Sequence, residues 1–445
     1  MALKKPNIVI YLSDDHGWEY LGCYGNEYIQ TPHLDGIAEE GIHFTHAFTP
    51  TPTCAPSRST LYTGLYPARH GAMGNHTECH AHLKSLPSTL RELGYRVAIA
   101  GKTHVKPETL FDFEYIGGFL PKRPEHRRKY RAEGLDTGPV KRFLSSHRQE
   151  NPDQPICLIL GDSNPHVTWE PNKIYDPDAL PLPPYIADTP IARNALTNYY
   201  QDITTMDTRI GEVDKMLETH GYTDNTLFIY TTDHGSEWPH CKWTLYDTGT
   251  RLPFIARWRG EIPADTVTDA MISHVDFFPT LIDIAGGQPS DDDDLDGKSF
   301  KKVLLGQQAT FRDKIYGTHT RDGNMNVFPQ RCVRDTRYKY ILNLMPENRW
   351  TTHFTEVEGI PESHAEVWKS WVKKAETDPQ TAQLIYLTQH HPVEELYDIT
   401  MDPYEFNNLA FSAETRPILE KMRTDVRYWM RSQNDEGKRE ICNSN

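Results

Sequence analysis

A cysteine at the start of a predicted helix, four residues before an arginine, is the part of this sequence best placed for chemistry. The stretch comprises Thr53, Cys54, Ala55, Pro56, Ser57 and Arg58. Pro56 suits the first turn of a helix, and residues 57–66 continue at helical spacing. Cys54 would then lie at the positive end of the helix dipole, where anions bind and the pKa of a thiol falls. The alternative is a buried cysteine with a structural role only.

Carboxylates follow two predicted strands. Asp14 and Asp15 come after the apolar run 7–12, and Asp233 with His234 comes after the run 227–231. Open α/β sheets bind ligands at the carboxyl ends of such strands, and adjacent carboxylates repel each other unless a cation lies between them. An Asp pair after a strand is also common as a helix cap or turn. Three carboxylates are hard oxygen ligands, which favours calcium over zinc.

Basic side chains follow two further strands. Lys102 and His104 come after the predicted strand 96–100, and their spacing would point both to the same side of an extended segment. His166 comes after the strand 156–160, and Lys242 lies in a later loop. Without other information, a lysine in the position of Lys102 is usually exposed, and His166 is equally well explained as a hydrogen-bonded loop histidine.

The cysteine motif resembles the signature of the type I sulfatases, a family of the alkaline phosphatase superfamily. The resemblance rests on Cys54 to Arg58 together with Leu61, Thr63, Gly64 and Arg69. In that family a formylglycine-generating enzyme, or an anaerobic maturation enzyme, oxidises the cysteine to formylglycine. The resemblance implies that one hydroxyl of the aldehyde hydrate attacks sulfur and that the other later collapses to expel sulfate.

The same resemblance implies roles for residues at the strand ends. It makes Asp14, Asp15, Asp233 and His234 ligands of a calcium ion, together with the modified residue 54. The residues expected to act in catalysis are Cys54, Arg58, Lys102, His104, His166 and Lys242. In this reading His166 or Lys242 protonates the leaving group.

One branch of the family, the sulfamidases that act on N-sulfated glycans, matches further residues. They include His76, His80 and residues 107–109 and 111–113. His234 and Lys242 depart from this branch, which has asparagine and arginine there. Residues expected to touch a sugar are His76, His80, Glu237, Trp238 and His240, the last three being equally well explained as surface-loop residues. The implied substrate is a sulfated saccharide.

The predicted fold is α/β, a large and mainly parallel sheet flanked by helices, with a smaller carboxyl-terminal antiparallel sheet plus helix. Helices are expected at 190–219, 276–285 and 414–431, and strands of the small sheet at 315–319, 330–333 and 338–342. The domain boundary is placed near residue 310, giving a catalytic domain of residues 1–310 and a subdomain of 311–445.

Composition excludes several other classes of protein. The net charge of −15 would repel nucleic acid and acidic membranes, so a sulfated substrate needs a locally basic pocket. The 7 cysteines lack paired spacing, which argues against a disulfide framework and a zinc site.

The apolar runs are too short to span a membrane. A periplasmic or secreted location would require an export signal that is missing from the sequence, and otherwise the location would be cytoplasmic. The oligomeric state is not predicted.

Three other functions are compatible with parts of this sequence. A phosphonate or phosphate monoester hydrolase of the same superfamily would use a related site. An inactive glycan-binding relative would have little reason to carry the full set of metal and sulfate residues. A thiol redox protein using Cys54 is disfavoured, because no resolving cysteine lies nearby in the sequence.

Overall fold

The computed structural model describes residues 5–118, 134–288, 294–323, 325–355 and 362–437. The basic run at 122–131 and most of the acidic run at 291–294 lie outside the described residues. Among the helices that are described, none is long and apolar enough to cross a membrane.

Within the described residues, a mixed sheet of nine strands forms the centre of the molecule, in the order β4-β3-β5-β1-β6-β7-β2-β8, with β9 paired to β2. The strands are β1 (Asn7–Ser13), β2 (Ile42–Phe48), β3 (Arg96–Gly101), β4 (Glu114–Tyr115), β5 (Ile156–Gly161), β6 (Thr226–Thr232), β7 (Arg251–Arg257), β8 (Thr266–Thr268) and β9 (Ile272–Ser273). Pairings among β3, β5, β1 and β6 are parallel, whereas β7 is antiparallel to both β6 and β2.

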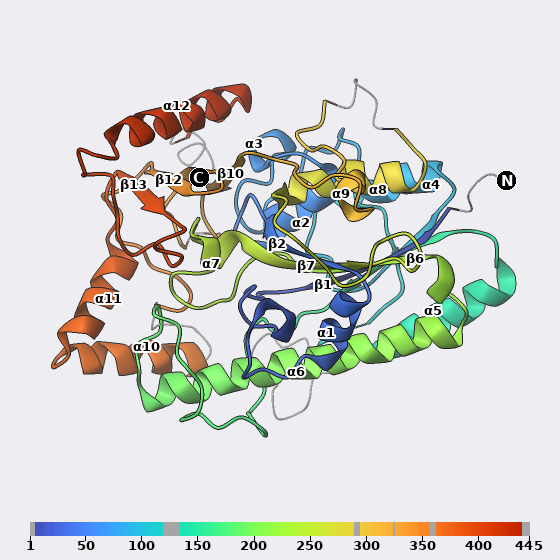
Figure 1. The fold of residues 1–445 in the computed structure, drawn as a ribbon, viewed down its shortest axis with the longest axis horizontal. Helices are drawn as coiled ribbons and strands as arrows, with labels where there is room; N and C mark the ends of the chain where they lie inside the picture. The colour runs from blue at the N-terminus through green and yellow to red at the C-terminus, as the bar shows by residue number, and fades with distance from the viewer. Residues whose placement is uncertain (1–4, 119–133, 289–293, 324, 356–361, 438–445) are drawn as a thin grey trace.

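Helices cover both faces of this sheet (Figure 1). On one side lie α1 (Pro32–Glu39), α5 (Thr137–Glu150) and the long α6 (Pro190–Thr219). On the other lie α2 (Cys54–Thr63), α3 (Pro67–His70), α4 (Leu86–Glu92), α8 (Phe277–Ile284) and α9 (Lys301–Leu304). Alternate residues of the central strands enter two separate apolar clusters, so that Val9 and Tyr11 face one layer while Ile8 and Ile10 face the other.

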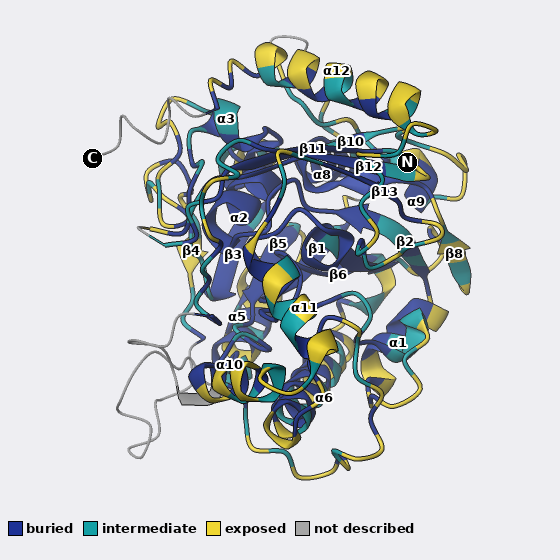
Figure 2. Cartoon of the chain, turned by 90° about the vertical axis from the view of Figure 1, so that its left-hand side faces the viewer, coloured by how far each residue is buried: buried dark blue, intermediate teal, exposed yellow. Residues whose placement is uncertain are grey.

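A second sheet of four antiparallel strands lies beside the first, in the order β10-β11-β12-β13. Its strands are β10 (Ile315–His319), β11 (Gln330–Arg334), β12 (Tyr338–Asn343) and β13 (Glu394–Asp398). The amphipathic helix α12 (Arg416–Ser432) packs its apolar side on this sheet and exposes the other (Figure 2). Helices α10 (Glu362–Ala375) and α11 (Pro379–Gln389) connect β12 to β13, and the short α7 (Asp247–Thr250) precedes β7.

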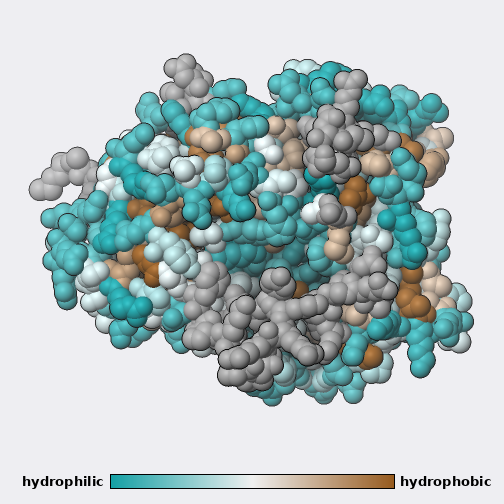
Figure 3. Space-filling view, turned by 180° about the vertical axis from the view of Figure 1, so that it is seen from behind, coloured by the Kyte–Doolittle hydropathy of each residue, from teal (hydrophilic) through white to brown (hydrophobic). Residues whose placement is uncertain are grey.

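Hydrophilic side chains predominate on the face turned away from the viewer in Figure 1, and hydrophobic ones form small separate patches there (Figure 3). The predicted fold class is confirmed by the two sheets and their flanking helices. The predicted helix at 190–219 matches α6, and the three predicted strands of the small sheet match β10, β11 and β12 to within a residue. The division of the chain near residue 310 stays a prediction.

Candidate active site

Four strand ends and one helix start bring the predicted residues together. Because β3, β5, β1 and β6 are parallel neighbours, their carboxyl ends meet at one edge of the sheet (Figure 2). Asp14 directly follows β1, Lys102 follows β3 and Asp233 follows β6. Cys54 is the first residue of α2, which ends at Gly64 with a left-handed φ of 69°.

The acidic residues and His234 surround the cysteine. The Sγ atom of Cys54 lies 3.2 Å from His234 Nε2 and 3.5 Å from Asp14 Oδ1. The Nε2 atom of His234 lies 3.3 Å from Asp15 Oδ1 and 3.6 Å from Asp233 Oδ1. All five side chains are buried. The geometry therefore gathers the Asp14 and Asp233 carboxylates and an imidazole nitrogen around residue 54, with Asp15 Oδ1 beside that nitrogen.

These donors fit a hard divalent cation. Asp15 Oδ1 is buried and has no hydrogen-bond partner, because the neighbouring atoms are also acceptors. His234 Nδ1 lies 3.0 Å from the carbonyl of Gly235, so this nitrogen carries the proton and a neutral ring turns the lone pair of Nε2 toward the carboxylates. Lone pairs that face one another in a buried site repel, and a bound cation such as calcium would satisfy them.

Each carboxylate also has a basic partner. Lys102 donates to Asp14, Lys242 Nζ donates to Asp15 Oδ2 at 2.8 Å, and Arg58 Nε donates to Asp233 Oδ2 at 2.9 Å. Burial alone would raise the pKa of Asp14, but Lys102 and the other cations hold it well below its ordinary value. Burial would lower the pKa of Lys242, but Asp15 keeps it raised. These lysines therefore stay charged near the cysteine.

The cysteine itself differs from the prediction. Burial and the nearby Asp14 carboxylate raise the pKa of the Cys54 thiol well above its ordinary value, although the helix start was expected to lower it. The side chain is only 2% exposed, and the carboxylate at 3.5 Å outweighs the helix dipole. An unmodified Cys54 is therefore a poor thiolate nucleophile, which argues further against thiol redox chemistry.

Comparison with known proteins identifies the family. A family model described as Sulfatase matches residues 6–287, more than half of the chain, and one described as N-sulphoglucosamine sulphohydrolase, C-terminal, matches residues 236–369. The chain belongs to the sulfatase family. It is 34% identical to an ulvan-active sulfatase of Formosa agariphila, over 97% of this chain and 81% of the relative. It is 27% identical to the N-sulphoglucosamine sulphohydrolase of Homo sapiens, over 96% and 90% of the two chains.

Solved structures share the fold of this sulfatase. A structure described as a 2-O GAG sulfatase superposes with a TM-score of 0.72 at 20% identity, over 97% of this chain and 93% of the other. A second, described as a complex with its substrate D-glucosamine-2-N,6-O-disulfate, gives a TM-score of 0.70 at 20% identity, over 97% and 99%. At this identity the two likenesses support the fold alone.

Next to these acidic residues of the sulfatase lies a second polar group. His166 Nε2 is 3.8 Å from Asp15 Oδ2 and 3.9 Å from Glu237 Oε2. Lys242 Nζ lies 3.7 Å from the same Glu237 oxygen. Burial would lower the pKa of His166, but Asp15 and Glu237 raise it above its ordinary value. His166 and Lys242 thus lie together, as expected of two candidates for one proton transfer.

The lysine and histidine after β3 do not share an extended segment. His104 has a left-handed backbone with φ of 52°, so the expected alternation fails there. Its Nε2 lies 2.9 Å from Nδ1 of His76, whereas Lys102 reaches Asp14. His80 is exposed and its ring stacks on that of His82. The structure therefore brings His76 to His104, and both His76 and His80 are exposed at the surface.

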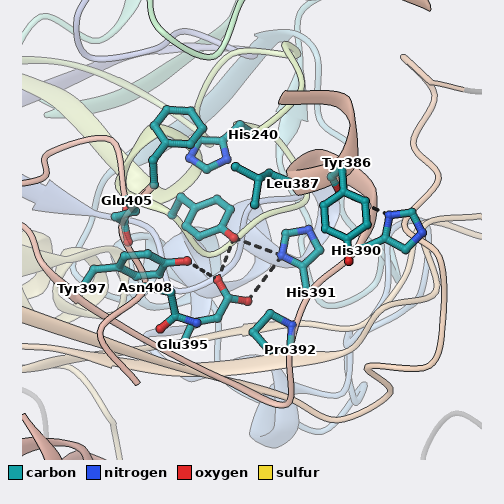
Figure 4. A pocket seen from close by; sticks show the side chains of 12 residues that line it. His240, Tyr386, Leu387, His390, His391, Pro392, Glu395, Tyr397, Glu405 and Asn408 are labelled. Atoms are coloured by element: carbon teal, nitrogen blue, oxygen red, sulfur yellow. Dashed lines mark hydrogen bonds and ion pairs between the residues drawn. The ribbon is translucent and has the colours of Figure 1, made fainter. Parts of the chain in front are cut away.

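Two of the residues suggested for sugar contact are enclosed by other side chains. Trp238 is 0% exposed and packs against Trp169 and Phe354. His240 lines a cavity of about 360 Å³ under α11, shown in Figure 4, where its Nε2 lies 2.7 Å from the carbonyl of Tyr404. Trp238 and His240 therefore have little surface available to a sugar, because the loop that carries them packs beneath α10 and α11 rather than lying at the surface. Glu237 has the better position, beside His166 and Lys242.

Two residues near Cys54 carried no sequence pattern that could have singled them out. Asn75 Oδ1 accepts a hydrogen bond of 3.1 Å from the backbone N–H of Ala55. Asp322, from the carboxyl-terminal part, accepts a hydrogen bond of 3.1 Å from Asn75 Nδ2. Single Asn and Asp residues in loops are common, and only the fold reveals that these two meet beside the cysteine.

Proposed function

We propose that this sulfatase hydrolyses a sulfate ester or sulfamate on a saccharide, using a formylglycine made from Cys54 and a bound calcium ion. Relatives support a saccharide substrate: two are named for ulvan and for N-sulphoglucosamine, and a third is an N-acetylglucosamine-6-O-sulfatase of Bacteroides thetaiotaomicron. The observation that carries the proposal is the meeting of Asp14, Asp15, Asp233 and His234 around residue 54.

The charge of the site supports the need for a cation. Arg58, Lys102 and Lys242 face four carboxylates, those of the three metal-binding aspartates and Glu237. With a protonated His166 these side chains sum to a formal charge of zero, so the protein alone supplies no net attraction for a sulfate group. Asp14, Asp15, Asp233 and His234 would hold the calcium ion, which supplies two positive charges and polarises sulfuryl oxygens as a Lewis acid.

A maturation enzyme is the partner that this chemistry requires, since formylglycine supplies a hydroxyl nucleophile toward sulfur that the Cys54 thiol does not. The chain's own residues do the rest. Lys102 and Lys242 bind and orient the sulfate oxygens, and the buried Arg58 neutralises negative charge beside them. His166 or Lys242 donates a proton to the leaving oxygen or nitrogen of the sugar. His104 accepts a proton from the hydroxyl group at position 54.

Sulfate release from a panel of N- and O-sulfated mono- and oligosaccharides tests the proposal. Mass spectrometry of the peptide that holds residue 54 should first establish that the sample is converted, and elemental analysis should return one calcium ion per chain. We expect release from at least one saccharide and none by Cys54→Ala. A converted enzyme that cleaves only aryl esters, or that prefers an aryl phosphonate to the matched aryl sulfate, would overturn the proposal.

A further inference from the structure

Strained backbone marks the surroundings of Cys54. Four non-glycine residues near the site have left-handed backbones: Asp15 (φ 65°), His76 (φ 66°), His104 (φ 52°) and Trp243 (φ 67°). Such conformations cost about 1 kcal/mol or more each and persist only where the surroundings enforce them. Two of these residues, His76 and His104, have rings that contact each other, and a third, Trp243, contacts the same carboxylate as His76.

A chain of contacts runs from Asp322 to His104. Asp322 Oδ1 lies 3.5 Å from Nε2 of His76, and Nδ1 of His76 lies 2.9 Å from Nε2 of His104. His76 is 64% exposed and this contact is longer than an ordinary hydrogen bond, but a carboxylate attracts an N–H and repels a lone pair, so the His76 nitrogen that faces Asp322 carries a proton. In the neutral ring the other nitrogen of His76 is then an acceptor. His104 must therefore carry its proton on Nε2.

With its proton on Nε2, His104 has a free lone pair on Nδ1. That atom is buried and has no hydrogen-bond partner within the described residues. Burial and the charge of Lys102 lower the pKa of His104 to about 2, which agrees with a neutral ring. An unpartnered basic nitrogen beside the predicted sulfate-binding Lys102 is available to receive a proton.

Asp322 also supports the helix that begins at Cys54. Its second oxygen, Oδ2, accepts hydrogen bonds from Asn75 Nδ2 at 3.1 Å and from Trp243 Nε1 at 2.8 Å. Because the amide of Asn75 is fixed in this way, its Oδ1 is turned toward the backbone N–H of Ala55, 3.1 Å away. Asp322 is 6% exposed, so the carboxylate is largely shielded from water.

We propose that Asp322 is a positioning residue of the reaction: through His76 it fixes the tautomer of His104 that can take a proton at Nδ1, and through Asn75 it fixes the backbone at residue 55. This inference rests on the proposed function, in which His104 takes a proton from residue 54. It also means that the site is completed by a residue beyond position 310, the predicted end of the catalytic domain.

Asp322→Asn is the sharpest test, because the surroundings dictate how the new amide must turn. Two donors, Asn75 Nδ2 and Trp243 Nε1, face the Oδ2 position and require an oxygen there. The NH₂ group must then face His76, which reverses the order of protons and places the proton of His104 on Nδ1. We expect kcat on a cleaved saccharide to fall on the order of 10²-fold with little change in KM, as for a base held in the wrong tautomer.

Matched variants separate the two effects proposed for Asp322, one through His76 and one through Asn75. His76→Ala should lose about as much kcat as Asp322→Asn, and the double variant should lose little more, since both act through His104. Asn75→Ala should add its own separate loss to that of His76→Ala. Asp335→Asn, in the hairpin between β11 and β12, should behave like the unchanged enzyme. A kcat within twofold of the unchanged enzyme for Asp322→Asn, or fully additive losses with His76→Ala, would overturn the proposal.

Nitrogen-15 NMR of histidine-labelled protein tests the tautomer without any turnover. His104 can be assigned by comparison with His104→Gln. We expect a neutral ring protonated on Nε2 in the unchanged protein and on Nδ1 in Asp322→Asn. A ring protonated on Nδ1 in the unchanged protein, or an unchanged tautomer in the variant, would refute the inference. The expected tautomers without sulfate release from any saccharide would instead reject the proposed function alone.

Discussion

At the scale of single residues, the proposed mechanism offers two candidates, His166 and Lys242, for one step, the protonation of the leaving group. His166 has one nitrogen engaged, since Nδ1 lies 2.7 Å from the carbonyl of Val167, and its Nε2 faces the site near Asp15 and Glu237. Lys242 is held more tightly, 2.8 Å from the Asp15 carboxylate. A proton donor must release its proton to the substrate, and the more loosely paired His166 is better placed to do so.

We therefore predict that His166→Ala slows different substrates unequally. A sugar alkoxide is a poor leaving group that needs a proton, whereas a nitrophenolate leaves without one. The rate on a saccharide should fall on the order of 10²-fold or more, and the rate on an aryl sulfate much less. Steady-state kcat on the two substrates measures this. Equal losses on both would assign the proton to Lys242 instead.

The pH dependence of the rate on a saccharide tests the same prediction in a second way. His166 must be protonated to act as the acid, and its pKa is raised above the ordinary 6.5. The rate on a saccharide should therefore be sustained to a pH above 6.5 and fall as the pH rises through the raised pKa. His166→Ala should lack this alkaline limb.

At the scale of elements, a buried ion-pair cluster joins α7 to the small sheet. Asp247, the first residue of α7, accepts from Arg334 of β11 at 3.0 Å and also contacts Lys339 of β12 at 2.5 Å. Burial would raise the pKa of Asp247, but Arg334 and Lys339 hold it far below its ordinary value. This carboxylate therefore helps to hold the second sheet beside the loop that carries Lys242.

Asp247→Asn should destabilise the protein and change its response to acid. At neutral pH the loss should be about 3–5 kcal/mol, because two buried cations lose a partner. The unfolded chain binds the proton more readily than the folded one, so the contribution is complete above the unfolded pKa of about 3.9 and is lost as pH falls below it. Thermal unfolding midpoints between pH 3 and 8 should show a large gap between variant and parent at pH 7 that narrows in acid.

Asp188→Asn provides the control for that measurement. Asp188 pairs with Arg193 at 2.6 Å but is 56% exposed, so its removal should cost no more than about 1 kcal/mol. A midpoint for Asp247→Asn that matches the control at neutral pH would show that the cluster does not hold the two sheets together.

Helices and strands were predictable from the sequence where their hydrophobic pattern was regular. The unbroken apolar runs of β1, β5 and β6 and the regular spacing of α6 were found from the sequence, because burial on both faces or on one stripe dictates those patterns. Strands β2 and β7 were missed. Two histidines interrupt β2, and β7 contains Pro253, which rarely lies inside a sheet because it has no N–H to donate.

At the scale of the whole molecule, residues were predictable where a motif or strand end selected them. Asp14, Asp15 and Asp233 lie together beside Cys54 because the parallel strands β1 and β6 end at one edge of the sheet, where ligands of open α/β sheets are expected. Asp322 could not be found in this way. It lies 89 residues beyond Asp233, in a part of the chain whose contact with the site depends on how the two sheets pack.

The net charge of the whole protein gives a last prediction. A charge of −15 repels a polysulfated chain at long range, although the proposed site would attract a single sulfate once calcium is bound. Salt screens the long-range field over a Debye length of about 10 Å at 0.1 M. Raising ionic strength from about 20 to about 200 mM should therefore increase kcat/KM for a polysulfated oligosaccharide by roughly a few fold.

The dependence on substrate charge distinguishes this field from other effects of salt. A monosulfated saccharide should show a smaller increase than a polysulfated one, because repulsion grows with the charge on the substrate. Glu218→Lys with Glu420→Lys, two exposed sites on α6 and α12, should raise kcat/KM for the polysulfated substrate at low salt and flatten its salt dependence. If salt instead lowers kcat/KM more steeply for the more highly charged substrate, a basic surface near the entrance must outweigh the net charge and guide the glycan in.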